Sequence, residues 1–244
     1  MIPKIIHLCW VGGGKYPVEI RECIESWKHH LPDYEIKLWD REAVLAIGCD
    51  FANEALEAGK WAFVADVVRF YAVWKFGGIY MDSDILVLKR FDQYIPQKGF
   101  TTVHEHLGQQ ILLQAAFFMG EPGNEFCRRC FEYYRTNHFL LPDGKLNMTI
   151  SPVVMKDVAE GMGWQPEDKT QHLEADTVIL PGHLVTPANH VKRHPEAFAQ
   201  HRIMGSWRKR KLGRRIEIAI KHALHNLRYH LTHIGRRVTL PGED

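Results

Sequence analysis

The sequence predicts an α/β fold in which a Rossmann-like, mixed and mainly parallel sheet is flanked by helices. The chain opens with an apolar strand, a helix and a second strand, the order typical of parallel sheets. A long apolar helix is expected over residues 61–76, directly before another strand. With 244 residues, 45% of them hydrophobic and 25% charged, the chain can bury the core of one large α/β domain.

The opening unit follows from local signals. Residues 4–11 form an apolar run that ends at three consecutive glycines, where the backbone must turn or approach something closely. Pro17 suits the first turn of the helix that follows, and apolar residues recur at helical spacing until Pro32. The second strand is expected from Glu35 to Trp39.

The apolar pattern of the expected helix over residues 61–76 is interrupted by two charged residues, Asp66 and Arg69. The helix ends at a Gly-Gly pair. Because these charges are three positions apart, they share one helical face. Residues 79–88 then predict a single strand interrupted by the carboxylates Asp82 and Asp84.

The rest of the chain gives weaker signals. A strand is expected near residues 100–103, an apolar stretch at 111–119 and a helix at 125–134, while residues 138–200 are interpreted as rich in loops. The five cysteines are odd in number and scattered, so a reducing compartment is expected. Cys127 and Cys130 are interpreted as buried residues of an amphipathic helix rather than as a metal or redox pair.

Charge divides the chain into two parts. Residues 1–207 hold 21 Lys and Arg against 26 Asp and Glu, whereas residues 208–244 hold 10 against 3. The N-terminus runs into a strand without a secretory signal pattern, and no apolar window of roughly 18 residues predicts a membrane-spanning helix. We therefore expect a cytoplasmic protein with a globular domain over residues 1–207 and a basic tail over 208–244.

Asp82 and Asp84 carry the chemical hypothesis. If the chain turns after Met81, both carboxylates reach a common point, and carboxylates so close together need a cation. Oxygen ligands favour Mn2+ or Mg2+, which would also bind the phosphates of a substrate and stabilise a departing diphosphate. Taken alone, an Asp-x-Asp sequence is also explained by solvated turn residues.

The context of this pair resembles a known signature. Residues 65–84 contain Asp-x-x-Arg and then Gly-Gly-x-Tyr-x-Asp-x-Asp, as do glycosyltransferase family 32, the fungal initiating alpha-1,6-mannosyltransferases and the large clostridial glucosylating toxins. Residues 2–13 look like the opening strand of that family, and residues 201–207 like its closing His-x-x-x-x-Ser-Trp element. The resemblance implies a GT-A type fold over residues 1–207 and a metal-dependent glycosyltransferase that binds a nucleotide-diphosphate sugar.

The resemblance implies a donor site at the carboxyl ends of the strands. Trp10, with Val11 beside it, would flank the nucleobase. Asp66 and Arg69 would bind sugar hydroxyls and phosphate, and Tyr80 would also contact the donor.

The resemblance also implies a metal site next to the donor. Asp82 would bridge ribose, sugar and metal, Asp84 would bind the metal directly, and His201 would be a third ligand. Ser206 and Trp207 would lie near the diphosphate. Asp66, Arg69, Asp82 and Asp84 form the implied catalytic set.

Two positions depart from the family pattern. Gln114 and Ala115 stand where the family places an Asn before a short apolar run, and Ile150-Ser151-Pro152 stands for a Thr-Gly-Pro-like element. Both departures concern the acceptor side and the far face of the sugar.

Structural alternatives accompany these roles. Trp10 could be a core residue, Asp66 and Arg69 a simple ion pair on a helix, and His201 an ordinary surface histidine. His104-Glu105-His106 resembles a metal site, but adjacent strand residues face opposite ways, so we expect none there.

The resulting expectation is a retaining hexosyltransferase or N-acetylhexosaminyltransferase, with a UDP-sugar favoured, that acts on a glycan in surface polysaccharide synthesis. The alternatives are a GDP-mannose-dependent mannosyltransferase, a non-catalytic sugar-nucleotide-binding protein and a haloacid-dehalogenase-like phosphatase. Leu86 disagrees with the phosphatase pattern, which has Thr or Val at that position.

The basic tail adds an expectation about location. Apolar residues recur every three or four positions over residues 208–234 among many Lys and Arg, which predicts an amphipathic helix. Such a helix would lie on an anionic membrane, at its inner face, and present the active site to a lipid-linked acceptor. Docking on the catalytic domain or on a second subunit is the alternative, and nucleic acid is not expected because aromatic residues are sparse there.

Overall fold

The opening unit forms as predicted: β1 (Ile5–Cys9), α1 (Val18–His30) and β2 (Glu35–Trp39). The structure is a computed structural model and describes residues 2–187, 194–202, 225, 229 and 239–242. The helices that follow are α2 (Arg41–Leu45), α3 (Asp50–Glu57), α4 (Trp61–Phe76), α5 (Glu125–Thr136) and α6 (Ser151–Glu160), with 3-10 turns η1 (Asp92–Tyr94) and η2 (Gly182–Leu184). The further strands are β3 (Gly78–Met81), β4 (Ile85–Val87), β5 (Phe100–Leu107), β6 (Gln110–Gly120), β7 (Gln171–Leu173), β8 (Thr177–Leu180), β9 (Val185–Pro187) and β10 (Ala199–His201).

The strands form two sheets. The large sheet has the order β2-β1-β3-β6-β5-β8-β7, and the small one has the order β4-β10-β9. In the large sheet, β1 pairs in parallel with β2 and β3, and β5 with β8, whereas β6 is antiparallel to both β3 and β5. The prediction of a mixed α/β fold is confirmed.

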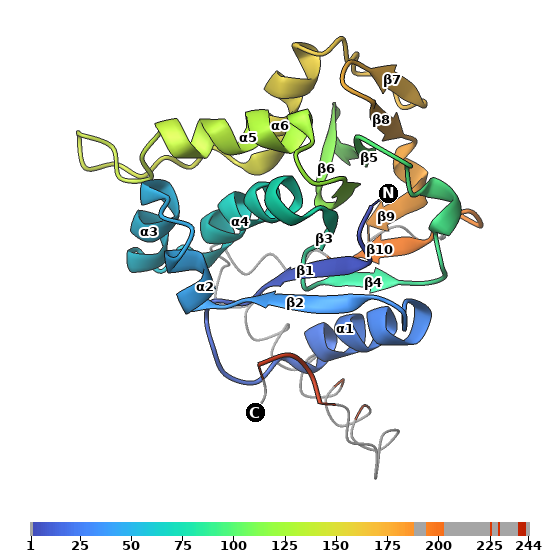
Figure 1. Cartoon of the computed structure of the whole chain (residues 1–244), viewed down its shortest axis with the longest axis horizontal. Helices are drawn as coiled ribbons and strands as arrows, with labels where there is room; N and C mark the ends of the chain where they lie inside the picture. The colour runs from blue at the N-terminus through green and yellow to red at the C-terminus, as the bar shows by residue number, and fades with distance from the viewer. Residues whose placement is uncertain (1, 188–193, 203–224, 226–228, 230–238, 243–244) are drawn as a thin grey trace.

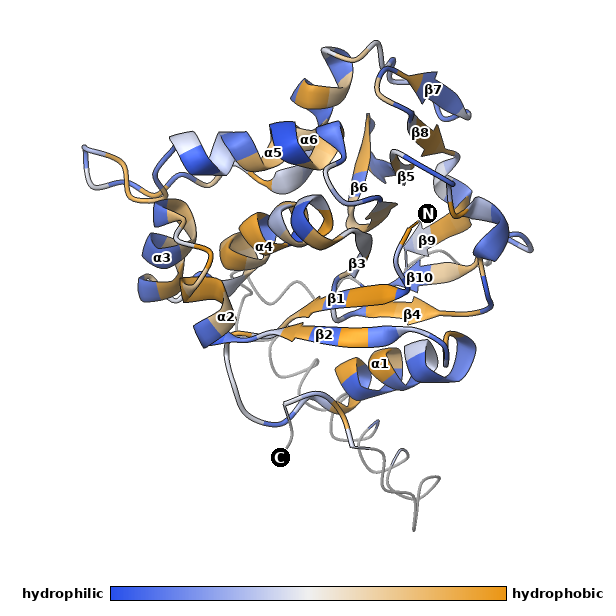
Figure 2. Ribbon diagram, viewed as in Figure 1, coloured by the Kyte–Doolittle hydropathy of each residue, from blue (hydrophilic) through white to orange (hydrophobic). Residues whose placement is uncertain are grey.

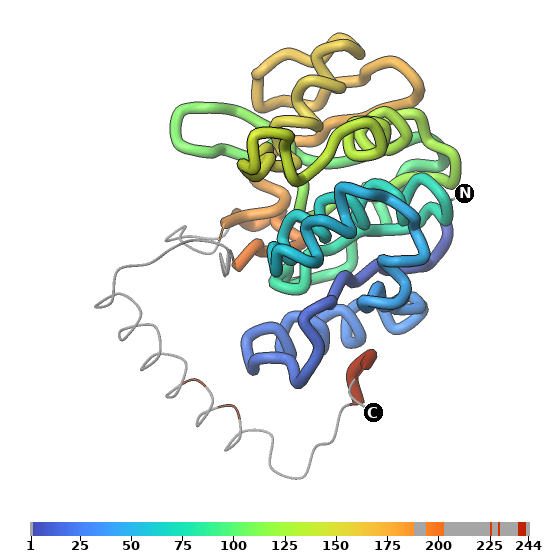
Figure 3. The backbone as a smooth tube through the Cα atoms, turned by 90° about the vertical axis from the view of Figure 1, so that its left-hand side faces the viewer, coloured from blue at the N-terminus to red at the C-terminus, as the bar shows by residue number. Residues whose placement is uncertain are grey.

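Helices cover both faces of the large sheet. Figure 1 shows α1 on one side of β1 and β2, with α4 and α5 on the other. The buried residues of α1 and α5 are apolar or aromatic, and Figure 2 shows hydrophilic residues along the outward side of both helices. In Figure 3 the segments from α5 to β8 lie in one half of the molecule and β1, α1 and β2 in the other.

Helix α4 is apolar on nearly every side because it is buried between the large sheet and α5. The chain then leaves α4 through two glycines with positive φ, Gly77 (64°) and Gly78 (100°). A Cβ at Gly78 would lie 2.5 Å from the carbonyl oxygen of Ile5 on β1, so glycine is needed for β3 to lie against β1. The Gly-Gly pair thus sets the start of β3 and hence the position of the turn at residues 82–84, here called the acidic turn.

Two expectations about this region are corrected. Residues 79–88 are two strands rather than one interrupted strand: β3 belongs to the large sheet and β4 to the small sheet. Residues 138–200 are less irregular than expected, because they contain α6, η2 and the four short strands β7 to β10. These short strands lacked the longer alternating pattern that identifies a strand from sequence.

The cysteines behave as expected of small apolar residues. All five are free, and Cys127 and Cys130 are fully buried on the inner side of α5. Burial raises the pKa of both thiols well above its ordinary value, so neither is a reactive thiolate. None of the helices in the described part of the chain has the length and apolar character needed to cross a bilayer.

Candidate active site

The candidate site lies where the carboxyl ends of β1 and β3 meet. These strands are parallel, with Ile6 opposite Ile79 and His7 opposite Tyr80, so the residues after Cys9 and Met81 share one edge of the sheet. The antiparallel strand β6 passes the same edge at Phe117, opposite Met81. Ligands bind at such an edge in open α/β sheets.

Asp82, Asp84 and His201 converge there. One ligand atom from each lies within 4.8 Å of the others, and Nε2 of His201 is 3.5 Å from a carboxylate oxygen of Asp84. The small sheet brings the histidine in, because His201 on β10 pairs with Ile85 on β4. Two carboxylates and one imidazole form a donor set suited to a divalent cation such as Mn2+.

His201 also faces a carboxylate that we did not predict as part of the site. Its buried Nδ1 lies 3.8 Å from Glu105 Oε1 on β5 and has no hydrogen bond within the described part of the chain. Burial alone would lower the pKa of His201, but the carboxylates of Asp84 and Glu105 raise it to about 10. Without a metal, the ring is therefore a cation at neutral pH, and a bound divalent ion would take the place of its proton.

Asp66 and Arg69 form a buried ion pair next to this cluster. They are 6% and 5% exposed, and Arg69 Nη2 lies 2.8 Å from Asp66 and 3.4 Å from Asp82. Arg69 Nη1 also donates to the carbonyl of Ala115 across 2.7 Å. Burial raises the pKa of the Asp66 carboxyl, and the adjacent guanidinium opposes that shift. The interpretation of these residues as a solvated surface ion pair is wrong.

Tyr80 reaches the site through Asp82. The ring is 1% exposed and lies 5.0 Å beneath the guanidinium of Arg69. The hydroxyl donates a 2.7 Å hydrogen bond to Asp82 Oδ1, which fixes the orientation of that carboxylate. The structure therefore places Tyr80 as a partner of Asp82, and its contact with a donor remains a prediction.

The two departures from the family pattern lie against the same network. Ser151 Oγ donates a 2.7 Å hydrogen bond to Asp66 Oδ1, and Gln114 Oε1 accepts one from the amide of Ala116. Ala116 in turn accepts the amide of Asp82, so Gln114 helps to hold the start of the acidic turn. Sequence reasoning noted both residues without these contacts, because Asp66 is 85 positions from Ser151 and Ala116 reaches Asp82 only across the sheet.

Trp10 and Val11 lie just beyond β1, at the same edge of the sheet. Trp10 is partly buried, and its ring centroid is 4.8 Å from that of Tyr16. Its indole Nε1 is buried and has no hydrogen-bond partner among the residues that the structure describes. Val11 packs against the core cluster that contains α4. Base binding by Trp10 remains a prediction, and Ser206 and Trp207 lie outside the described residues.

The two histidines of the His104-Glu105-His106 segment contact other groups, and the expectation that they form no metal site stays a prediction. His104 Nδ1 donates to the carbonyl of Leu180, and its Nε2 accepts from the indole of Trp164. His106 pairs with Asp168 at 2.7 Å. The alternation along β5 sends Glu105 to the opposite face, toward His201.

Comparison with known proteins gives consistent results. Residues 17–101 match the family described as the glycosyltransferase sugar-binding region containing the DXD motif. An inositol phosphoceramide mannosyltransferase of Schizosaccharomyces pombe is 34% identical over 91 residues, which is 34% of this chain and 24% of that protein. An uncharacterized glycosyltransferase of Acanthamoeba polyphaga mimivirus is 27% identical over 157 residues, which is 62% of this chain and 61% of that protein.

One solved structure has a similar fold. The PaToxG glycosyltransferase structure superimposes with a TM-score of 0.50 at 17% identity, over 66% of this chain and 69% of that one. The chain spans less than two thirds of the length of both relatives that match in sequence. Residues 17–101 are thus similar to the DXD-containing glycosyltransferase family, and the likeness to the solved structure shows a GT-A type fold.

Proposed function

We propose that the chain is a divalent-metal-dependent, retaining glycosyltransferase that moves a hexose or N-acetylhexosamine from a nucleotide-diphosphate sugar to a glycan acceptor. One observation carries this proposal: Asp82, Asp84 and His201 converge within 4.8 Å beside the buried Asp66–Arg69 pair. The first set suits a cation and the second suits the polar groups of a sugar phosphate.

The position of each residue gives it a separate proposed role, either metal binding or orientation of the metal ligands. Asp82, Asp84 and His201 would hold Mn2+ or Mg2+, which when bound stabilises negative charge on the departing diphosphate. Arg69 holds Asp66 and Asp82 at fixed separation, and Tyr80 fixes the rotation of Asp82. Because Arg69 is already paired with two carboxylates, its guanidinium is oriented before any ligand arrives.

The donor is proposed to be a UDP-sugar, because Trp10-Val11-Gly12-Gly13 is closer to the toxin branch of the resembling family. The relative from S. pombe is named a mannosyltransferase, which favours GDP-mannose as the second candidate. The unpaired indole N–H of Trp10 at the same sheet edge supports a role for this residue next to a polar ligand.

The test is donor turnover. The full-length protein would be incubated with Mn2+ and separate UDP- and GDP-sugars, and nucleotide release would be followed. We expect one UDP-sugar to be consumed, EDTA to abolish release, and added Mn2+ to restore it. Consumption of GDP-mannose alone would select the second candidate, and full turnover in EDTA would exclude the metal-dependent mechanism.

We further propose that the acceptor is lipid-linked and that residues 208–234 bind the inner face of an anionic membrane. This segment is almost entirely outside the described residues, and the proposal rests on its apolar periodicity and its basic charge. The test is sedimentation of the full-length chain with phosphatidylglycerol vesicles at low salt, with phosphatidylcholine vesicles as control. Failure to sediment with the anionic vesicles would remove the membrane role.

A further inference from the structure

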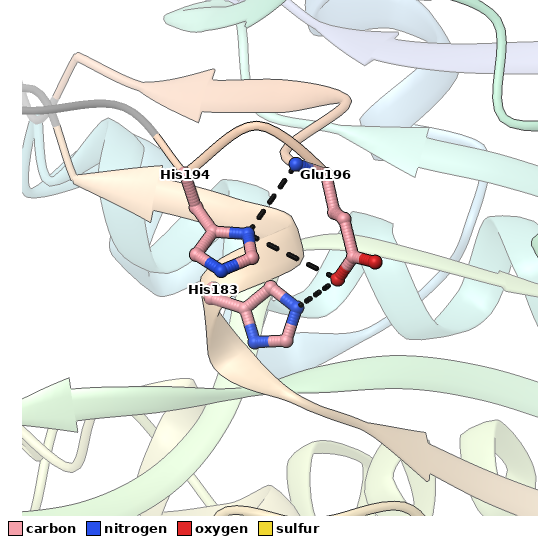
Figure 4. Close-up of side chains that lie close together, drawn as sticks. All are labelled: His183, His194 and Glu196. Carbon is pink, nitrogen blue, oxygen red and sulfur yellow. Dashed lines mark hydrogen bonds and ion pairs between the residues drawn. The ribbon is translucent and has the colours of Figure 1, made fainter.

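A second group of potential metal ligands lies away from the acidic turn. His183 is in η2, immediately before β9, and both His194 and Glu196 lie in the segment that leads into β10. Figure 4 shows the two imidazole rings side by side with the Glu196 carboxylate at their edge. The hydrogen bond from the Phe198 amide to the Leu184 carbonyl holds the two segments together.

The distances in this group are close to those around a shared ion, and His183 and Glu196 are also in direct hydrogen-bond contact. His183 Nε2 lies 3.0 Å from Glu196 Oε2, and His194 Nδ1 lies 4.0 Å from the same oxygen. One ligand atom from each residue lies within 4.8 Å of the others. Bonds of about 2.0–2.2 Å to a tetrahedral zinc ion separate neighbouring ligand atoms by roughly 3.4 Å, a value between these two distances.

The orientation of the rings is also suitable. The ring centroids of His183 and His194 are 4.1 Å apart, so two cationic rings would repel each other there. The amide of Glu196 donates to His194 Nδ1 at 3.3 Å, so that nitrogen is unprotonated, and a metal ion bound there would replace this hydrogen bond at its lone pair. His183 Nε2 would release its hydrogen-bonding proton when it binds a metal.

We propose that His183, His194 and Glu196 form a second metal site, which takes Zn2+ and is separate from the Asp82–Asp84 site. Imidazole nitrogen is a good ligand for Zn2+, whereas Mn2+ and Mg2+ prefer oxygen. Three protein ligands leave the fourth position of a tetrahedral ion for water. The partial exposure of both histidines gives an ion access from solvent.

The position of the site suggests what the ion does. It joins the starts of β9 and β10, which pair in parallel, and the other end of β10 carries His201. Zn2+ would therefore fix the strand that delivers a ligand to the acidic turn, without contacting that turn. This inference does not depend on the proposed donor or reaction.

The experiment separates the two sites by mutation. The full-length Asp84→Asn variant, which lacks a ligand of the acidic turn, would be stripped with EDTA and titrated with Zn2+ against a chromogenic chelator. We expect it to keep one Zn2+ site. Adding His183→Ala or His194→Ala should lower the Zn2+ affinity at least about tenfold, since each removes a ligand. The matched control is His172→Ala, which removes an exposed histidine on β7.

Two further measurements protect the test against a folding defect. Circular dichroism would show whether each variant is folded, and Glu196→Gln would remove the charged ligand with almost no change in shape. Zn2+ should raise the melting temperature of Asp84→Asn, and not that of the variant that also carries Glu196→Gln. Equal Zn2+ affinity in the His183→Ala, His194→Ala and His172→Ala variants would overturn the proposal, since any bound ion would then lie elsewhere.

Discussion

Ser151, the first residue of α6, donates a 2.7 Å hydrogen bond to the buried carboxylate of Asp66 on α4, 85 positions earlier in the chain. Asp66 also pairs with Arg69 on its own helix. Its carboxylate therefore links α6, through Ser151, to the Arg69 side chain near the acidic turn. The orientation of the Arg69–Asp82 pair therefore depends on a residue that does not reach the metal ligands.

Replacing Ser151 with Ala should weaken both stability and donor binding. A buried carboxylate that loses a hydrogen bond costs about 1–3 kcal/mol of the free energy of unfolding. Urea unfolding and the KM for the donor would measure the two effects. The control is Val153→Ala, an exposed position on the same helix, where we expect less than about 0.5 kcal/mol. Equal effects in both variants would contradict the role of the hydrogen bond.

Asp84→Asn should abolish tight Mn2+ binding while the fold survives. The amide keeps the shape of the side chain but removes a charged ligand, so the Mn2+ affinity should fall more than about tenfold. Electron paramagnetic resonance of free Mn2+ would measure this, with the exposed Asp143→Asn as control. Unchanged Mn2+ binding in Asp84→Asn would show that the ion binds elsewhere.

Metal binding should release a proton from His201. Because Asp84 and Glu105 raise its pKa to about 10, the ring is protonated in the metal-free protein at pH 7. Mn2+ affinity should therefore rise with pH between 6 and 9, with about one proton released per ion. Calorimetry in buffers of different ionisation enthalpy would count the protons. A His201→Gln variant should lose this release, and identical counts in both proteins would refute the assignment.

The buried His7 should make the fold sensitive to mild acid. Burial lowers its pKa to about 4, and its ring donates from Nε2 to the Gly77 carbonyl and accepts at Nδ1 from Trp39. Between pH 4 and 6.5 the unfolded chain binds this proton more readily, so the free energy of unfolding should rise with pH by up to about 3 kcal/mol. Urea unfolding across this range would show it. His7→Asn should flatten the profile, and the exposed His172→Asn should not.

Gly78→Ala should be far more damaging than another glycine substitution at positive φ. Its Cβ would lie 2.5 Å from the Ile5 carbonyl oxygen, so β1 and β3 would have to separate, at a cost of more than about 3 kcal/mol. Gly108 also has positive φ (64°) but nothing within 4 Å of a Cβ, so Gly108→Ala should cost only about 1 kcal/mol. Thermal unfolding of both variants gives the comparison, and similar melting temperatures would contradict it.

The parts of the fold that were predictable are those with a strong local pattern. The apolar run of α4, its Gly-Gly end and the two aspartates are adjacent in sequence, and the structure keeps them together. The division between β3 and β4 was not predictable, because two short apolar segments on either side of Asp82-Ser83-Asp84 are also compatible with one interrupted strand. Only the pairing of β4 with β10 separates them.

The site residues that sequence reasoning missed depend on contacts between distant segments. Alternation along β5 correctly predicted that His104 and Glu105 face opposite ways. It did not show whether His104 or Glu105 points toward the site, because that depends on the position of His201 on β10. From the sequence, Ser151 was recognised only as part of an incomplete Thr-Gly-Pro-like element. Its hydrogen bond to Asp66 depends on the packing of α6 near α4.

The division of β3 and β4 between two sheets has a consequence for ion selectivity. Residues 82–84 connect β3 of the large sheet to β4 of the small sheet, so the packing of the two sheets contributes to the geometry of this turn. Phe117 of β6 and Phe198 beside β10 form part of that packing, with ring centroids 5.1 Å apart. Mg2+ requires oxygen atoms at about 2.0–2.1 Å in near-octahedral geometry, while larger ions tolerate wider sites. If the proposed ion binds Asp82 and Asp84, we expect this aromatic contact, as well as the ligands themselves, to affect which ionic radius the site accepts.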